Sequence, residues 1–543
     1  MKRVLVILAI AICLSFCSSS AVAQSCLTKE DVTRLIQRIN QPQPQKPDKK
    51  LENELVKLAT ATQEKLQDYV KQEKKTDSLR KRVSSQNEKA TAKLCQVLKD
   101  VGWPTKGLVE EAGVQSAFYL LKTSAPYELQ RDLLPVIVAA VKQDESQKPE
   151  FAGVLDRLRV GAGMKQLFGT QAIIRNGFLV LYPIEDEAHV DERRAQFGLR
   201  PMAEHLRTLE RQYQTPVVKS RDIPPSQLSS GLKQSISGAI QSTLLDTPPI
   251  SEGDVIRTDT NLVNLNVSVF SNKLKTFVSA LTKDDFKVFE DGKEQTVSYF
   301  ASTEVPFDLV LLVDLSGSTE RKRDLIRQST QRFIEAARPA DRISIVTFSD
   351  KVNVLSPLTS DRTRLLESIT DMTGGGGSSI WDALKFSLDN IVGQKGLERR
   401  RAIVMMTDGV DGALSYFHDD FGSQISFADL LEAVRQTDTL IVPIYLDTES
   451  DDSPSSWTRQ MYENARKTLG ALAEESGGTY YKAKKIADLN GVYEQVINDL
   501  GKVYSLGYKP ENDKRDGTWR SVQIQIVNRP DLIARSRPGY YAQ

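Results

Sequence analysis

Three short segments of the sequence carry oxygen-bearing side chains that suit a divalent cation. Asp314, Ser316 and Ser318 form an Asp-x-Ser-x-Ser motif. Ser378 follows a run of four glycines, and Asp408 comes shortly after an apolar segment. Hydroxyl and carboxylate oxygens are hard ligands, and a set with few negative charges suits Mg²⁺, with Mn²⁺ or Ca²⁺ as alternatives. We therefore expect these five residues to hold one metal ion.

The segments around these residues predict a doubly wound parallel α/β sheet. Apolar strands are expected at 308–313, 342–348, 402–406 and 440–445, with helices at about 320–337, 361–372, 380–392, 425–437, 457–476 and 487–502. Continuous apolar strands are typical of a sheet buried on both faces, and alternation with helices favours parallel order. Ligands bind at the carboxyl ends of such strands, which is where the three segments fall.

Taken in this order, the three segments make residues 304–503 resemble a von Willebrand factor A domain with a metal-ion-dependent adhesion site. The resemblance implies that the hydroxyls of Ser316, Ser318 and Ser378 bind the metal directly. It implies that Asp314 and Asp408 bind largely through water. The open coordination position is then expected to take a carboxylate from a partner protein.

The second segment departs from the family pattern. Ser378 stands where the family has threonine, and Ser379 beside it is a neighbouring candidate. The change keeps the hydroxyl and loses a methyl group, so a degenerate site that binds no metal stays an alternative. Asp382 and Asp411 lie near the expected site, and Asp382, in the first turn of a helix, is expected to act as a cap or as a group that supports the ligands, not as a ligand itself.

Strands are expected on both sides of this domain, over residues 255–303 and 504–543. Alternating apolar residues and an Asp-Gly turn at Asp291 predict a hairpin before the domain. Because isolated hairpins are marginal in water, we expect the two sets of strands to pair into a small β-sandwich. The flanking motifs, including Leu281–Phe286 and Arg537–Tyr541, resemble an acidobacterial-type subgroup of exported bacterial von Willebrand A-type proteins.

The N-terminal half is expected to be mostly helical. Residues 24–100 predict a helical hairpin or coiled-coil region, and residues 214–254 read as a linker. Residues 101–213 resemble a helical domain of an uncharacterised bacterial family, which implies no activity. Its charged residues form either a polar pocket or, as we favour, salt bridges between helices; they are Glu110, Glu111, Asp156, Arg157, Asp191 and Arg194.

The first residues predict export. Lys2 and Arg3 precede an apolar run over 4–16, and small residues place cleavage after Ala23. The signal peptide 1–23 indicates a secreted or periplasmic protein. A lipid anchor on Cys17 or Cys26 is the alternative, and no membrane contact is expected beyond the export signal.

Two cysteines remain after cleavage, Cys26 and Cys95, which form either a disulfide or two free thiols. With Lys+Arg 72 against Asp+Glu 71, the chain lacks the basic surplus of a nucleic-acid binder. Three histidines far apart in the sequence make a zinc centre improbable.

These observations favour a protein-binding module for adhesion or assembly that engages an acidic residue of its partner through the metal. The alternatives are a hydrolase or other enzyme in the helical domain, and a structural protein with a degenerate metal site. We expect no enzyme and no small-molecule cofactor, because no Ser/His/Asp order or nucleophile elbow is present. His418, after the third segment, is expected at the surface.

Overall fold

The computed structural model describes residues 25–542, except 43–45, 72–76, 223–225, 227, 245–261, 272, 274–275, 302–304, 371, 393–398, 415–421, 448–455 and 484–487. The expected signal peptide and His418 lie outside the described residues. The chain divides into two compact units. The first contains residues 1–205 and 219–254, and the second contains 206–218 and 255–543.

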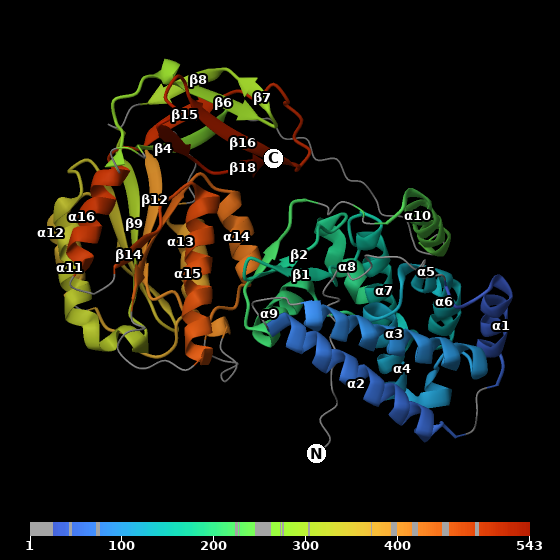
Figure 1. Cartoon of the computed structure of the whole chain (residues 1–543). Helices are drawn as coiled ribbons and strands as arrows, with labels where there is room; N and C mark the ends of the chain where they lie inside the picture. Colours follow the sequence, from blue (N-terminus) through green and yellow to red (C-terminus); the bar gives the residue numbers. More distant parts are fainter. Residues whose placement is uncertain are drawn as a thin grey trace. The chain divides into compact units, whose positions relative to one another are not determined.

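The first unit is built mainly from helices (Figure 1). They are α1 (Lys29–Ile39), α2 (Lys49–Lys71), α3 (Asp77–Asp100), α4 (Lys106–Thr123), α5 (Tyr127–Asp132), α6 (Leu134–Gln143), α7 (Lys148–Gly161), α8 (Val190–Gln196) and α10 (Ser230–Leu244). A hairpin of β1 (Ala172–Arg175) and β2 (Phe178–Leu181) interrupts them. The helical N-terminal region is therefore confirmed, with a hairpin that the sequence analysis did not predict.

Helices α2 and α3 run antiparallel. Lys93 of α3 pairs with Glu54 near the start of α2, and Gln86, earlier in α3, bonds to Thr62, about two turns later in α2. The apolar stripe of α2 enters the core of the unit through Leu55, which is fully buried beside Leu94 in one cluster. This is the packing that the interrupted leucine spacing predicts.

The stretch expected as a linker contains regular structure. Strand β3 (Val217–Lys219) and helix α10 lie within it. Ile236 and Ile240 of α10 are buried in the main core of the first unit. Four residues apart, they occupy one face of the helix, so α10 is an integral part of that core.

The second unit contains a six-stranded sheet with the order β11-β10-β9-β12-β13-β14. The strands are β9 (Phe307–Asp314), β10 (Arg342–Phe348), β11 (Val352–Thr359), β12 (Arg400–Thr407), β13 (Leu440–Leu446) and β14 (Tyr481–Ala483). All neighbours are parallel except the pair β10–β11. The predicted parallel α/β sheet is confirmed.

Helices cover both faces of this sheet (Figure 1). On one face lie α11 (Arg323–Ala336), α12 (Arg362–Ser368) and α16 (Leu489–Leu500). On the other lie α13 (Ile380–Asn390), α14 (Phe427–Arg435) and α15 (Ser456–Ser476). The eight side chains of β9 are all buried, as a strand covered on both sides requires.

Two further sheets form a β-sandwich from strands on both sides of the α/β sheet in sequence. One has the order β17-β4-β15-β8 and the other β18-β16-β6-β7, while the short β5 pairs with β4. The strands are β4 (Val263–Ser271), β5 (Thr276–Phe277), β6 (Phe286–Glu290), β7 (Lys293–Gln295), β8 (Val297–Ala301), β15 (Tyr504–Tyr508), β16 (Trp519–Ile526), β17 (Leu532–Arg535) and β18 (Gly539–Tyr541).

The core of the sandwich confirms the predicted pairing of early and late strands. Leu265 and Val267 of β4, Val288 of β6 and Leu506 of β15 are fully buried in one cluster. The turn between β6 and β7 has positive φ at Asp291 and Gly292, 48° and 80°, as the Asp-Gly signal predicts.

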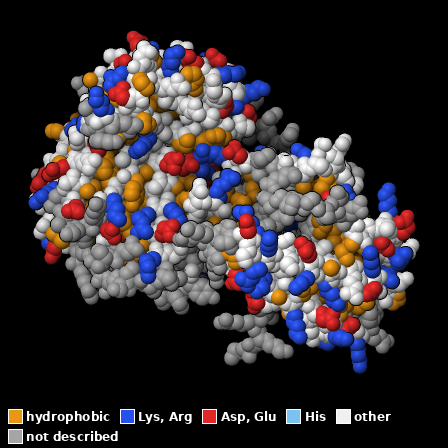
Figure 2. All heavy atoms as spheres, viewed as in Figure 1, with side chains coloured by type: hydrophobic (Ala, Val, Ile, Leu, Met, Phe, Trp, Pro, Cys, Tyr) orange, Lys and Arg blue, Asp and Glu red, His pale blue; other side chains and the backbone are white. Residues whose placement is uncertain are grey.

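Charged side chains of both signs are interspersed over the face seen in Figure 2. This mixture agrees with the near-balanced count of 72 basic and 71 acidic residues. Within the described ranges, no helix combines the length and hydropathy needed to cross a bilayer.

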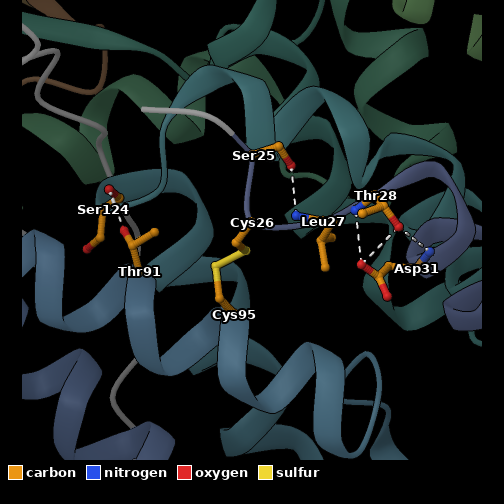
Figure 3. The surroundings of a disulfide bond; sticks show 8 residues. All are labelled: Ser25, Cys26, Leu27, Thr28, Asp31, Thr91, Cys95 and Ser124. Carbon is orange, nitrogen blue, oxygen red and sulfur yellow. Dashed lines mark hydrogen bonds between the residues drawn. A yellow bond between two sulfur atoms is a disulfide. The ribbon is translucent and has the colours of Figure 1, made fainter. Parts of the chain in front are cut away.

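Cys26 and Cys95 form a disulfide (Figure 3). It joins the segment that precedes α1 to helix α3, with the two Cα atoms 6.1 Å apart and a sequence separation of 69. Next to it, Thr28 caps α1 by accepting a hydrogen bond from the backbone N–H of Asp31 at 3.1 Å. Of the two states left open by the sequence, the structure has the disulfide.

Candidate functional site

The three predicted segments meet at the carboxyl end of the central strands. Asp314 is the last residue of β9, and Asp408 follows directly after β12, which pairs with β9 in parallel. Ser378 lies in the glycine-rich loop that leads into α13. The loop is joined to the first segment by a hydrogen bond of 3.0 Å from the Gly317 N–H to the Gly376 carbonyl.

Asp314 is the centre of the hydrogen bonds at this edge. Its Oδ1 accepts from the Ser316 N–H at 2.9 Å. Its Oδ2 accepts from the Thr407 hydroxyl at 2.6 Å and from the Ser378 hydroxyl at 3.5 Å. The hydroxyl oxygens of Ser316 and Ser318 lie 3.2 Å apart. A single buried carboxylate thus links side chains from all three segments.

Ser378 and Ser379 differ in what they contact. The Ser378 hydroxyl points to Asp314, whereas Ser379 makes its hydrogen bond through the backbone, from its N–H to the Ser349 carbonyl at 3.0 Å. Both residues are buried. Of the two candidates, Ser378 is the one whose hydroxyl joins the cluster around Asp314.

The electrostatics at this edge favour a cation. Asp314 is fully buried and Asp408 nearly so. Burial, together with the negative charge of Asp408, raises the pKa of Asp314 to about 7. An opposite charge within a few ångströms favours the ionised form of a carboxyl group, so a divalent cation would remove this repulsion. The donor set of hydroxyls and two carboxylates fits Mg²⁺.

The glycine run allows the loop to approach the strands closely. Gly376 has a φ of +88°, and a Cβ atom there would collide with the carboxylate of Asp350. A Cβ on Gly374 would collide with Leu315. Asp350 holds the loop in place, because its Oδ1 accepts from the Gly377 N–H at 2.6 Å. Asp350 and Thr407 are not among the site residues predicted from the sequence, although each lies at or just after the carboxyl end of a predicted strand.

Asp411 and Asp382 bind the backbone of the neighbouring chain. Buried Asp411 accepts hydrogen bonds from the N–H groups of Trp381, Ala413 and Ser423, at 3.1, 2.8 and 3.0 Å. Asp382 accepts from the N–H groups of Gln424 and Ile425, at 2.8 and 3.0 Å. The two carboxylates thus hold residues 423–425 against the start of α13.

The charged residues singled out in the helical region bind separate partners. Glu110 pairs with Lys49, and Glu111 pairs with Lys106 at 2.7 Å. Asp191 accepts from the Met202 N–H at 2.6 Å. Among the described residues singled out here, Glu110 makes a salt bridge between helices, from α4 to α2, whereas Glu111 and Lys106 both belong to α4.

Asp156, Arg194 and Arg157 satisfy local groups instead. Buried Asp156 accepts hydrogen bonds from the backbone of Leu167, Phe168 and Thr170 and from the Thr170 hydroxyl. Arg194 donates to backbone carbonyls, including that of Arg200 at 2.6 Å. The Arg157 guanidinium lies 5.3 Å from the ring centre of Tyr127. For Asp156 and Arg194 the expected salt bridges between helices are wrong, because backbone groups of the loops 162–171 and 197–201 use these charged side chains first. For Arg157 the contact is with an aromatic ring.

Comparison with known proteins adds two family matches and several structural ones. Residues 309–410 match the model described as von Willebrand factor type A domain, and residues 49–218 match the family of unknown function DUF6624. Among solved structures, the vWF domain of the type V pili tip protein Mfa5 from Porphyromonas gingivalis has 15% identity over 36% of this chain and 94% of its own, with a TM-score of 0.29.

Two other solved structures cover a similar part of the chain. BatB from Bacteroides thetaiotaomicron has 15% identity over 36% of this chain and 99% of its own, with a TM-score of 0.26. Proximal thread matrix protein 1 from the mussel byssus, with a zinc-occupied MIDAS motif, has 16% identity over 36% of this chain and 48% of its own, with a TM-score of 0.28. From the family matches, the chain is a protein with a von Willebrand factor type A domain and an N-terminal DUF6624 region.

Proposed function

We propose that the protein is an exported protein-binding module, used in adhesion or assembly, that grips a partner through a bound divalent cation. The observation that carries the proposal is that the buried carboxylates of Asp314 and Asp408 and several serine hydroxyls lie together at the carboxyl end of the sheet. Because the two carboxylates act largely through water in this proposal, they neutralise the cation only in part, and it stays attractive to an acidic side chain.

In this proposal, Ser316, Ser318 and Ser378 bind Mg²⁺ through their hydroxyls, with Mn²⁺ or Ca²⁺ as substitutes. Asp314 and Asp408 hold the remaining ligands, largely through water. Ser318 is exposed while Asp314 is buried, so the cluster reaches from the interior to the surface. A partner carboxylate completes the coordination from the solvent side.

Export is supported by the disulfide between Cys26 and Cys95. Disulfides persist mainly in oxidising compartments outside the cytosol. We propose that the mature chain begins after Ala23 and works as a secreted or periplasmic protein. Mass spectrometry of the protein recovered from its native host, with and without thiol alkylation, reports both the first residue and the state of the two cysteines.

The metal site is tested by titrating Mg²⁺ and Mn²⁺ into the mature chain and two matched variants. Ser378→Ala is expected to weaken binding by about tenfold or more, because it removes a ligand. Ser379→Ala, one residue away and equally buried, is expected to leave affinity unchanged. Equal effects of both variants would overturn the ligand assignment, and no binding by the unaltered chain would make the site degenerate.

The partner carboxylate is tested with Mn²⁺ at the site and an acidic model peptide. Water-proton relaxation reports coordinated water, and its enhancement is expected to fall as the peptide displaces one water molecule. A matched peptide with glutamine in place of glutamate is expected to leave the relaxation unchanged. A cation that raises the melting temperature while neither peptide has an effect would indicate a purely structural role.

A further inference from the structure

A pocket of about 240 Å³ lies in the second unit, away from the three metal-binding segments. It forms where the loop 510–515 and strand β18 meet the end of α14 and the start of β4. Its lining includes four basic side chains, Arg435, Lys514, Arg515 and Arg537, and one acidic side chain, Asp513. Even with Arg435 paired to Glu475, the lining has more basic than acidic side chains, which favours an anionic ligand.

Arg537 is a half-buried cation with no carboxylate partner, and its guanidinium lies 5.6 Å from the ring centre of Tyr540. Its guanidinium donates to the backbone carbonyls of Thr437 and Asn264, at 3.3 and 3.0 Å, and Nε is buried with no partner. Burial lowers the pKa of Arg537. Within the described parts of the chain, no carboxylate lies within ion-pair distance of this group, and nearby Asp438 pairs with Arg401 at 2.9 Å.

Arg435, in the same pocket, differs from Arg537 because its charge is paired with two glutamates. Glu475 accepts two hydrogen bonds from it, each of 3.0 Å, and Glu432 accepts a third at 3.1 Å. Because a buried charge is costly unless it is paired, native arginines normally resemble Arg435. Arg537 has five N–H donors and uses two on neutral carbonyls, while its Nε–H is buried, so its charge and the second N–H of each terminal nitrogen are left for a ligand.

The rest of the lining narrows the class of ligand. Leu262, Val263, Pro510 and Tyr541 give the pocket apolar surface, and the exposed Lys514 adds a second cation at its edge. The planar fork of an arginine matches a carboxylate in a two-point contact. Asp513 at the lining disfavours ligands with several negative charges, because like charges repel.

We infer that this pocket binds the carboxylate of a singly charged ligand with an apolar group, as found in the C-terminal residue of a peptide or in a free apolar carboxylic acid. The site is separate from the proposed metal site and does not need the cation. It adds a second, carboxylate-specific contact to the unit that carries the von Willebrand factor A domain.

The probes separate three properties of the ligand: its negative charge, its apolar group, and whether it is a peptide terminus or a free acid. N-acetyl-leucine is titrated into the mature chain by NMR beside N-acetyl-leucinamide, acetate and inorganic phosphate. N-acetyl-leucine is expected to bind more tightly than the other three. A peptide that ends in alanyl-leucine and binds more tightly still would identify a peptide terminus, whereas equal affinity would identify the free acid. Equal binding of the amide, or no binding of any probe, would overturn the proposal.

Three variants locate the binding. Arg537→Gln is expected to lower the affinity for N-acetyl-leucine by at least about tenfold. Substitution of the exposed Lys514, Lys514→Gln, is expected to lower it by about two- to fivefold. Arg535→Gln, on an exposed arginine two residues from Arg537, is expected to have no effect. If Arg537→Gln does not fold, Lys514→Gln serves as the test. An unchanged affinity of the Lys514→Gln variant for N-acetyl-leucine would then overturn the proposal. EDTA is expected to leave binding intact, while loss in EDTA would assign the carboxylate to the metal site instead.

Discussion

Glu210 is a fully enclosed acid in the second unit, in the short segment 206–218 that packs there. Its Oε1 accepts hydrogen bonds from the N–H groups of Val217 and Phe427, at 3.1 and 3.0 Å, while Oε2 is buried without a partner. Burial raises the pKa of Glu210 well above its ordinary value of 4.5, and Asp429 and Asp411 add to the effect. The folded protein therefore retains a proton that the unfolded chain releases.

This difference makes Glu210 a source of pH-dependent stability. Above pH 4.5 the unfolded chain ionises Glu210 and the folded chain does not, so the group's contribution to stability falls as pH rises towards the raised pKa. Glu210→Gln is expected to flatten the loss of stability between pH 5 and 8, measured by denaturant unfolding. Exposed Glu474→Gln is the control, and identical pH curves for Glu210→Gln and the unaltered chain would contradict the expectation.

The five residues proposed as metal ligands could be chosen from the sequence, because motif and strand order both point to one sheet edge. The residues that hold them could not. Thr407 donates to Asp314 at 2.6 Å and Asp350 accepts from Gly377 at 2.6 Å. Each depends on a contact between segments far apart in the chain, and neither residue belongs to a spacing that distinguishes it from a surface threonine or aspartate.

At the scale of elements, the glycine-rich loop is the part most sensitive to a single methyl group. Gly376→Ala is expected to cost about 1–3 kcal/mol and to weaken metal binding, because φ is +88° and the new Cβ would meet Asp350. Gly470→Ala, inside α15 and facing open space, is expected to stabilise by about 0.5–1 kcal/mol. Thermal unfolding with and without Mg²⁺ measures the stability of both variants. If Gly376→Ala leaves the stability unchanged, the loop can relax around the new Cβ atom.

The elements predicted from sequence are those with a strong local pattern. The four apolar strands and the six helices of the α/β sheet fall within a few residues of their expected bounds. Strand β11 was not predicted, because as an edge strand it has a mixed pattern with only Ser356 buried. Strand β14 has three residues, and its pairing with β13 rests on contacts that no local spacing reveals.

For the whole chain, the two units carry different stabilising bonds. The disulfide between Cys26 and Cys95 belongs to the first unit, and the proposed metal site belongs to the second. Reduction is expected to lower the stability of the first by about 2–4 kcal/mol. Mg²⁺ at a hundredfold excess over its dissociation constant is expected to stabilise the second by about 2.7 kcal/mol.

Calorimetry should separate these effects. We expect two thermal transitions, one lowered by a reducing agent and insensitive to Mg²⁺, and the other raised by Mg²⁺ and insensitive to reduction. Cys95→Ser provides the control for reduction, because it should abolish any further response to the reducing agent. A single transition that responds to both treatments would show that the two units unfold as one.

The sandwich also determines how the second unit would respond to being pulled. The chain enters the α/β domain after β8 and leaves it into β15, and these two strands pair directly, with Ala301 opposite Ser505. Tension applied to the chain on both sides of the sandwich would pass from strand to strand across this pairing. The α/β domain between these two strands would lie outside the path of the force, so the proposed metal-binding edge would bear no load until the β8–β15 pairing separates.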